Sequence, residues 1–116
     1  MSDEDNAESA ARAWLALVDT GGYGRSWADA ADLFRRAVDQ PTWQKQLDAV
    51  RAPLGQLVSR QTKSRKYTKT VPGAPDGDYV ITTFETRFEK KQHAIETVTP
   101  MKDPDGSWRV SGYFIR

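Results

Sequence analysis

The spacing of apolar residues changes once along the chain, near Leu57, and this change constrains the fold more than any other feature. Before it, apolar residues recur every three or four positions, which is typical of amphipathic helices. After it, apolar and polar residues alternate, which is typical of strands with one covered face. Helices followed by strands predict an α+β fold, with the helices packed on one face of a curved antiparallel sheet.

Three helices are predicted in the first half of the chain. Capping residues and helix breakers mark their ends, and Ser26 followed by Asp29 resembles a capping box. The predicted helices begin after Asp5 or Asn6, at Ser26 and near Asp39 to Thr42, and they end at Gly21–Gly22, after Val38 and at Pro53–Gly55. Residues 1–6 are expected to form a disordered tail, and residues 1–116 a single domain.

Four strands are predicted in the second half, because clusters of turn residues divide it into alternating segments. The clearest turns are Pro72–Gly77 and Asp103–Gly106. The strands are expected within residues 58–71 and at about 79–88, 93–101 and 108–115.

Loop length decides which strand residues face each other across a hairpin. Even loops would place Glu85 opposite Glu96 and Met101 opposite Trp108. This register predicts a buried face made of Val80, Phe84, Phe88, Ile95, Met101, Trp108, Val110 and Phe114. It leaves Tyr79, Ile81, Val98, Tyr113 and Ile115 on an open face that is too apolar for water, which predicts a homodimer through that face.

Composition excludes several kinds of site. The chain has no cysteine and one histidine, His93, so we expect neither a metal site nor a cofactor. The net charge of +1 argues against nucleic acid or a membrane surface as a partner. Lys63, Arg65 and Lys69 could form a basic platform around Tyr67, but lysines on an edge strand more often prevent aggregation.

The first residues are acidic, and no apolar run is long enough for a membrane span. The chain as written is therefore expected to be cytoplasmic. A chain that starts at Met1 after a removed export signal would look the same, and it would be periplasmic or exported.

Two groups of residues are candidates for a site. Trp14, Trp43 and Trp108 could line a cavity between helices and sheet, with Arg51 reaching an anionic ligand, although such aromatics often only fill a core. Glu85 and Glu96, placed opposite each other, could raise one another's pKa into the range of a general acid. Two solvated glutamates relieved by neighbouring arginines are the alternative.

Several stretches resemble a family of small bacterial proteins known as domain of unknown function 4019. They are the segments 11–15, 26–27, 51–55, 72–77 and 108–113, of which Arg51-Ala52-Pro53-Leu54-Gly55 and Pro72–Gly77 are the most specific. The resemblance spans about residues 10–116 and implies no catalytic residue, although members are often exported. The order of elements also looks like the nuclear-transport-factor-2-like or cystatin-like architecture, which hosts enzymes and binding modules alike.

The sequence therefore predicts a non-enzymatic binding or interaction module that forms a homodimer. The alternative is an enzyme of the isomerase or dehydratase kind that uses a carboxylate, Glu85 or Glu96, in a pocket between sheet and helices.

Overall fold

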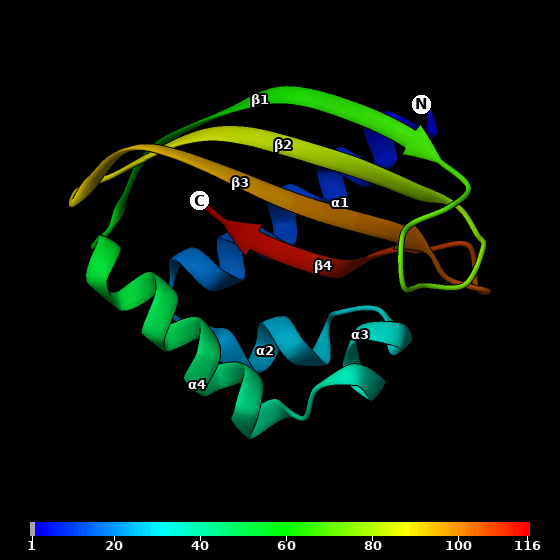
Figure 1. Ribbon diagram of the computed structural model, residues 1–116, viewed down its shortest axis with the longest axis horizontal. Coiled ribbons are helices and arrows are strands. Elements are labelled where there is room, and N and C mark those ends of the chain that lie inside the picture. The colour runs from blue at the N-terminus through cyan, green and yellow to red at the C-terminus, as the bar shows by residue number, and fades with distance from the viewer. Residues whose placement is uncertain (1) are drawn as a thin grey trace.

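The computed structural model describes residues 2–116 and has the predicted α+β architecture, with the helices first and a four-stranded antiparallel sheet after them (Figure 1). The strands lie in the order β1-β2-β3-β4. The elements are α1 (Asp3–Asp19), α2 (Tyr23–Ala28), α3 (Asp32–Ala37), α4 (Gln40–Arg51), the 3-10 turn η1 (Ala52–Leu54), β1 (Leu57–Thr68), β2 (Tyr79–Phe88), β3 (Lys91–Lys102) and β4 (Trp108–Ile115).

The first helix begins earlier than predicted. Ser2 caps it, because the Ser2 side chain accepts a hydrogen bond from the Asp5 backbone N–H at 3.1 Å. Acidic residues in the first turn also suit the positive end of the helix dipole. Residues 3–6 are therefore helical, and the expectation of a disordered tail is wrong for them. Met1 lies outside the described residues.

The second predicted helix is divided into α2 and α3. Ala31 between them has an extended backbone, and its N–H donates a hydrogen bond to the Val110 carbonyl at 2.8 Å. This contact with β4 replaces a helical bond. Ser26 lies inside α2 and is buried, so it does not cap a helix as the sequence predicted.

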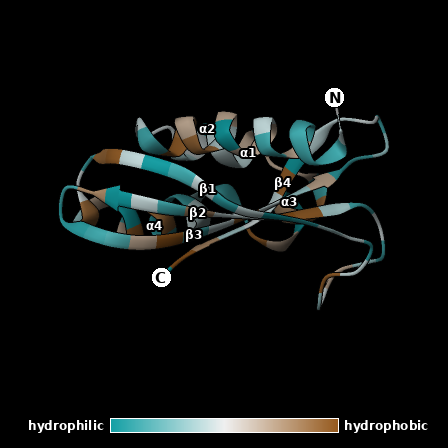
Figure 2. Cartoon of the chain, turned by 90° about the horizontal axis from the view of Figure 1, so that it is seen from above, coloured by the Kyte–Doolittle hydropathy of each residue, from teal (hydrophilic) through white to brown (hydrophobic). Residues whose placement is uncertain are grey.

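The helices do not all cover the sheet. In Figure 1, α1 runs behind the strands, whereas α2, α3 and α4 lie beside the edge formed by β4. Figure 2 shows α1 and α2 on one side of the strands. Of the helices, only α1 has contacts with all four strands. The sequence predicted three helices packed on one face of the sheet. In the structure, mainly α1 covers that face.

The strand register differs from the prediction by one residue in the β2–β3 hairpin. Phe84 pairs with Glu96, and Glu85 pairs with Ile95. In the turn Phe88 pairs with Lys91 instead of His93, which leaves the faces unchanged, and an irregularity between Thr86 and Phe88 then shifts the pairing by one residue. A one-residue shift moves every side chain of one strand to the other face. Glu85 and Glu96 are therefore not opposite each other.

The β3–β4 hairpin also differs. Lys102, rather than Met101, pairs with Trp108, and an irregularity between Val98 and Pro100 then brings Val98 opposite Tyr113. Ser111 and Gly112 of β4 thus lie opposite Thr99 alone, and this β-bulge in β4 re-aims the side chains that follow it.

These registers decide which side chains form the core. The predicted Val80, Phe84, Phe88 and Val110 are buried, but Ile95, Met101 and Trp108 are only partly buried and Phe114 is exposed. Residues at the alternate positions of these strands take their places in the core. The main cluster consists of Ala11, Trp14, Leu15, Val18, Ala30, Phe34, Trp43, Leu47, Phe84, Val98 and Val110.

The segment that links the helices to the sheet, residues 54–56, is hydrogen-bonded to the β2–β3 turn. Glu89 N–H donates to the Gln56 carbonyl at 3.0 Å, Lys90 N–H donates to the Leu54 carbonyl at 2.9 Å, and Gln56 N–H donates to Glu89 Oε1 at 2.7 Å. Gly55 in this link has φ of 75° and ψ of −160°, a conformation open mainly to glycine. A Cβ atom there would lie 2.9 Å from Glu89 Oε1.

The basic strand β1 is an edge strand, as predicted. It has register irregularities between Leu57 and Ser59 and between Thr62 and Ser64. Arg65 pairs with Asp5 of α1 at 2.6 Å. Charges and bulges of this kind protect an edge from pairing with another chain.

Candidate functional site

The predicted tryptophan cavity is not a single space. The rings of Trp14 and Trp43 lie 6.3 Å apart in the core, and the indole N–H groups of both bond to Ser26. Trp108 lies on β4 at the margin, and Arg51 belongs to a separate buried cluster of charges. The structure thus brings Trp14 and Trp43 together in the core, places Trp108 beside Trp14 at the margin, and leaves Arg51 in the charge cluster.

Ser26 organises the helical half of the core. Its carbonyl accepts the Trp14 Nε1–H at 2.8 Å, and its Oγ accepts the Trp43 Nε1–H at 3.0 Å. Its own hydroxyl donates to the Tyr23 carbonyl at 2.6 Å. Both indoles therefore find the partner that a buried N–H group requires.

Four charged residues form a buried network between helices and sheet. Arg60 of β1 donates from Nε to Glu96 Oε1 at 2.7 Å and from Nη1 to Asp19 Oδ2 at 2.8 Å. Arg51 of α4 donates from Nη2 to the same Asp19 carboxylate at 2.9 Å. The side chains of Glu96, Arg51 and Arg60 are 0%, 4% and 7% exposed. Two cations thus balance two anions in an interior where an unpaired charge would be costly.

The remaining acceptor positions of Glu96 are also used. Thr86 Oγ1 donates to Oε1 at 2.6 Å, and the Tyr113 hydroxyl donates to Oε2 at 2.6 Å. Burial, together with the Glu96 carboxylate, raises the pKa of Tyr113 well above its ordinary value. Tyr113 therefore remains a neutral donor.

Asp19 is ionised in this network. Burial opposes ionisation and would raise the pKa of Asp19, but hydrogen bonds from Arg60 and Arg51 outweigh burial and lower it below its ordinary value. Arg51 lies against the Phe88 ring, 4.7 Å from its centroid. Its Nε and Nη1 atoms have no hydrogen-bond partner among residues 2–116.

Glu85 and Glu96 lie on opposite faces of the sheet. Glu96 is in the network above, whereas the Glu85 side chain is 60% exposed and lies 4.0 Å from Lys63 Nζ. The predicted carboxylate pair is therefore absent, because the register is shifted by one residue.

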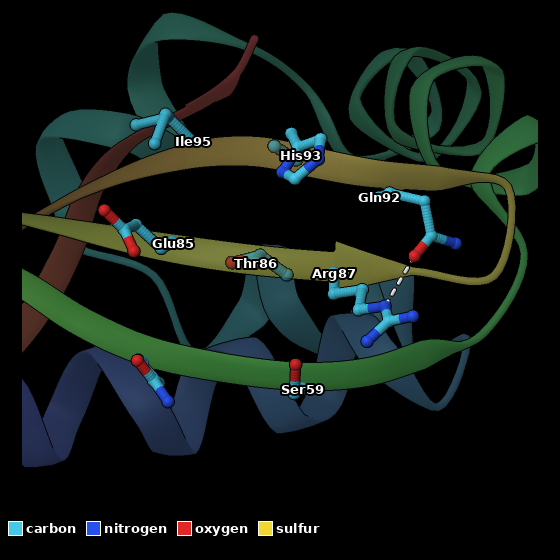
Figure 3. Close-up of a pocket in the computed structure, with 9 residues that line it drawn as sticks. Ser59, Glu85, Thr86, Arg87, Gln92, His93 and Ile95 are labelled. Carbon is cyan, nitrogen blue, oxygen red and sulfur yellow. Dashed lines mark hydrogen bonds between the residues drawn. The ribbon is translucent and has the colours of Figure 1, made fainter.

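Glu85 belongs to a shallow hollow on the open face, about 400 Å³ in volume (Figure 3). His93 and Ile95 of β3 line it beside Glu85, and Arg87 donates to Gln92 Oε1 at 2.5 Å on its rim. His93 is exposed, so the single histidine lies at the surface. In residues 2–116, no three histidine or acidic side chains are grouped so that they could hold a metal ion.

The five residues predicted to form a dimer interface do not share the open face. Val98 and Tyr113 pair with each other on the helix side, and Ile115 pairs with the inward-facing Glu96. Tyr79 is 1% exposed, and its hydroxyl donates to the Pro75 carbonyl in its own preceding loop. Only Ile81 remains on the open face, so the predicted set is wrong as an interface.

A second hollow, about 370 Å³ in volume, lies between α1 and β4. Trp14 and Trp108 both line it, with the small residues Ala10 and Ala13 and with Arg109. Arg109 is held by Asp105, and this hydrogen bond lowers the pKa of Asp105 to about 2. This hollow is the nearest equivalent of the predicted aromatic cavity.

A third hollow is the groove between α4 and β4, which we call the β4 groove. Its volume is about 250 Å³, and its walls are mainly apolar. Figure 2 colours the end of β4 as hydrophobic. The residues that line the groove are Trp43, Gln46, Leu47, Val50, Tyr113, Phe114 and Ile115.

Sequence reasoning missed Asp19 and Arg60, which join elements far apart in the chain. The sequence does contain one indication of the buried network, at Glu96. With Ala94 and Val98 it shares the parity of apolar positions in β3, and a charge among inward-facing residues indicates a buried partner. The partner itself lies 36 positions away and leaves no local pattern.

The fold and the network together define a small α+β protein in which buried ion pairs join the helices to an antiparallel sheet. The chain belongs to the family described as "Protein of unknown function (DUF4019)", whose model matches residues 10–113. This match confirms the resemblance found in the sequence, and the fold is compatible with the nuclear-transport-factor-2-like suggestion. No curated protein matches the chain in sequence. None of the helices described here is long and apolar enough to cross a membrane.

Proposed function

We propose that this protein is a non-enzymatic binding module and that the β4 groove is its binding surface. One observation carries the proposal. The large hydrophobic residues exposed in residues 2–116 are Val50, Val58 and Phe114, at 44%, 55% and 55%, and both Val50 and Phe114 line the β4 groove. Val50 lies beside the helix-side face of β4 and Phe114 on its other face, so exposed apolar residues flank this hollow from both sides, which is typical of an interaction site.

The buried carboxylates support a binding role over acid-base chemistry. Both oxygens of Glu96 already accept two hydrogen bonds each, from Arg60 and from either Thr86 or Tyr113. A carboxylate in this state fixes the orientation of its neighbours. An acid-base residue instead needs a position within hydrogen-bond reach of a substrate proton.

The groove also has an energetic reason to be covered. Each Å² of apolar surface removed from water contributes roughly 25 cal/mol, and Phe114 and Val50 leave such surface in water. Trp43 and Leu47, which also line the groove, belong to the core, so this part of the groove is already formed before a partner arrives.

An apolar reporter dye tests the proposal. Anilinonaphthalene sulfonate should fluoresce with the wild type, and Val50→Asp and Phe114→Asp should each remove most of that fluorescence. Val58→Asp is the matched control, because Val58 is exposed to the same degree as Phe114 but lies on β1 outside the groove.

Circular dichroism should show that all three variants remain folded. If the folded Phe114→Asp and Val50→Asp variants bind the dye as well as the wild type and Val58→Asp do, the β4 groove is not the binding surface and the proposal is wrong.

A further inference from the structure

We propose that the partner is an extended polypeptide segment that adds to β4 as a fifth strand, with alternate side chains in the β4 groove. This inference rests on the proposed function and names the kind of partner that the groove binds. It starts from the backbone of β4, which is an edge strand. An edge strand presents N–H and C=O groups that can pair with another chain.

The pairing of β4 with β3 shows which of these groups point outward. Ile95 and Arg116 exchange both of their backbone hydrogen bonds, at 2.8 and 3.0 Å. Such pairs alternate along an antiparallel ladder. The backbone N–H and C=O of Phe114 therefore also point toward β3, and those of Tyr113 and Ile115 point away from it. In the part of the chain that the structure describes, no residue outside the sheet bonds to those backbone groups.

The open part of the edge has a defined start. At Val110 the carbonyl already accepts the Ala31 N–H at 2.8 Å, so the segment between α2 and α3 occupies the edge there. Beyond the bulge, Tyr113 and Ile115 each offer one donor and one acceptor. A partner strand could therefore form four backbone hydrogen bonds at this place.

The two edges of the sheet are built differently. On β1, Arg60 points into the buried network, Arg65 pairs with acidic residues of α1, and two bulges interrupt the register. On β4, the residues from Val110 to Ile115 carry no charge. Natural sheets protect edges that must stay unpaired, and beyond its bulge β4 lacks the charged side chains that protect β1.

The groove supplies contacts for alternate side chains of the added strand. Tyr113 and Ile115 face the helix side, as their pairing with Val98 and Glu96 shows. A partner residue directly opposite either of them would direct its side chain to the same side, toward Leu47 and Val50 of α4. The next residue would lie beside Phe114. Aliphatic residues at alternate positions therefore suit the site.

The test uses an eight-residue peptide, acetyl-Lys-Thr-Val-Thr-Val-Thr-Val-Lys-amide, labelled with fluorescein and titrated by fluorescence anisotropy. Two matched peptides carry N-methyl groups on all valine amides or on all threonine amides. Their side chains are unchanged, and each has lost the hydrogen-bond donors along one edge only, because backbone groups alternate along a strand.

We expect the unmodified peptide to bind the wild type and Val58→Asp equally, and Phe114→Asp at least roughly tenfold more weakly. Methylation of the valine amides should weaken binding at least roughly tenfold, because each donor facing β4 is lost. Methylation of the threonine amides should change binding less than about twofold. This pattern corresponds to antiparallel addition, the more stable pairing.

Loss confined to the threonine-methylated peptide would also support strand addition, in the parallel direction. Equal binding of all three peptides, or no binding up to about millimolar concentration, overturns the inference. If the dye still binds the groove in that case, the proposed function stands. Sedimentation equilibrium of the wild type alone completes the test, because a dimer that Phe114→Asp dissociates would make a second copy the occupant and overturn the inference.

Discussion

Arg60 on β1 reaches past β2 to Glu96 on β3, and its Nε atom lies 2.7 Å from Glu96 Oε1. The contact joins two strands that are not neighbours. Through Asp19 it also joins the sheet to the end of α1. The geometry of the helix-to-sheet interface therefore depends on one side chain of the edge strand.

Replacing Arg60 with Met should destabilise the protein by about 3–5 kcal/mol, because Glu96 would be left as a buried and partly unpaired charge. Urea denaturation measures this loss. The control is Arg65→Met, which breaks an ion pair at the surface and should cost less than about 1 kcal/mol. Equal and small losses for both variants would mean that the network contributes nothing measurable.

Acid should weaken the same network through Asp19. Because the folded-state pKa of Asp19 lies below its ordinary value of 3.8, the contribution of Asp19 to stability is present above that pH and is lost as the pH falls below it. The free energy of unfolding of wild type and Asp19→Asn, measured by urea denaturation from pH 7 to pH 2, should therefore converge toward acid pH. A constant difference over the whole range would contradict this expectation.

Ser26→Ala should cost about 1–3 kcal/mol, because the Trp43 indole N–H would lose its partner in the core. Ser9→Ala is the control. Ser9 is an exposed residue of α1, and removing its hydroxyl should change stability by less than about 0.5 kcal/mol. Thermal unfolding followed by tryptophan fluorescence compares the two, and a Ser26→Ala protein as stable as Ser9→Ala would show that the hydrogen bond has no net value.

Phe84 and Trp108 distinguish the observed register from the one that the sequence predicted. Phe84 is fully buried, so Phe84→Ala should cost about 3–5 kcal/mol. Trp108 is only partly buried beside the α1–β4 hollow, so Trp108→Ala should cost less than about 2 kcal/mol. Chemical denaturation of both variants gives the comparison. The predicted register would instead make the two losses similar.

Local patterns were enough to place the strands. The bounds of β2 and β4 agree with the prediction, because turn residues such as Pro104 stop a strand wherever they occur. Register was harder, because an irregularity between Thr86 and Phe88 shifts the β2–β3 pairing by one residue, and no local pattern predicts it. An error of one residue then exchanged the two faces of β3.

The candidate site depended on that register. Phe114 was predicted to be buried and Tyr113 to lie on the open face, and the bulge in β4 reverses both positions. Ala31 shows a second limit, because its backbone breaks a helix to reach a strand 79 positions later, and no local propensity predicts such a contact.

The clamp between the β2–β3 turn and residues 54–56 has a consequence for folding. Its hydrogen bonds join Gln56 to Glu89, 33 positions apart, at the place where the helical half of the chain meets the sheet half. The link cannot take its final path until the hairpin between β2 and β3 exists. Closing the long loop between residues 56 and 89 costs entropy before the contacts that offset this cost have formed, so it is slow. The hairpin should therefore form early, and the helices should dock afterwards. In refolding experiments, protection of amide hydrogens in β2 and β3 should therefore precede protection in α4.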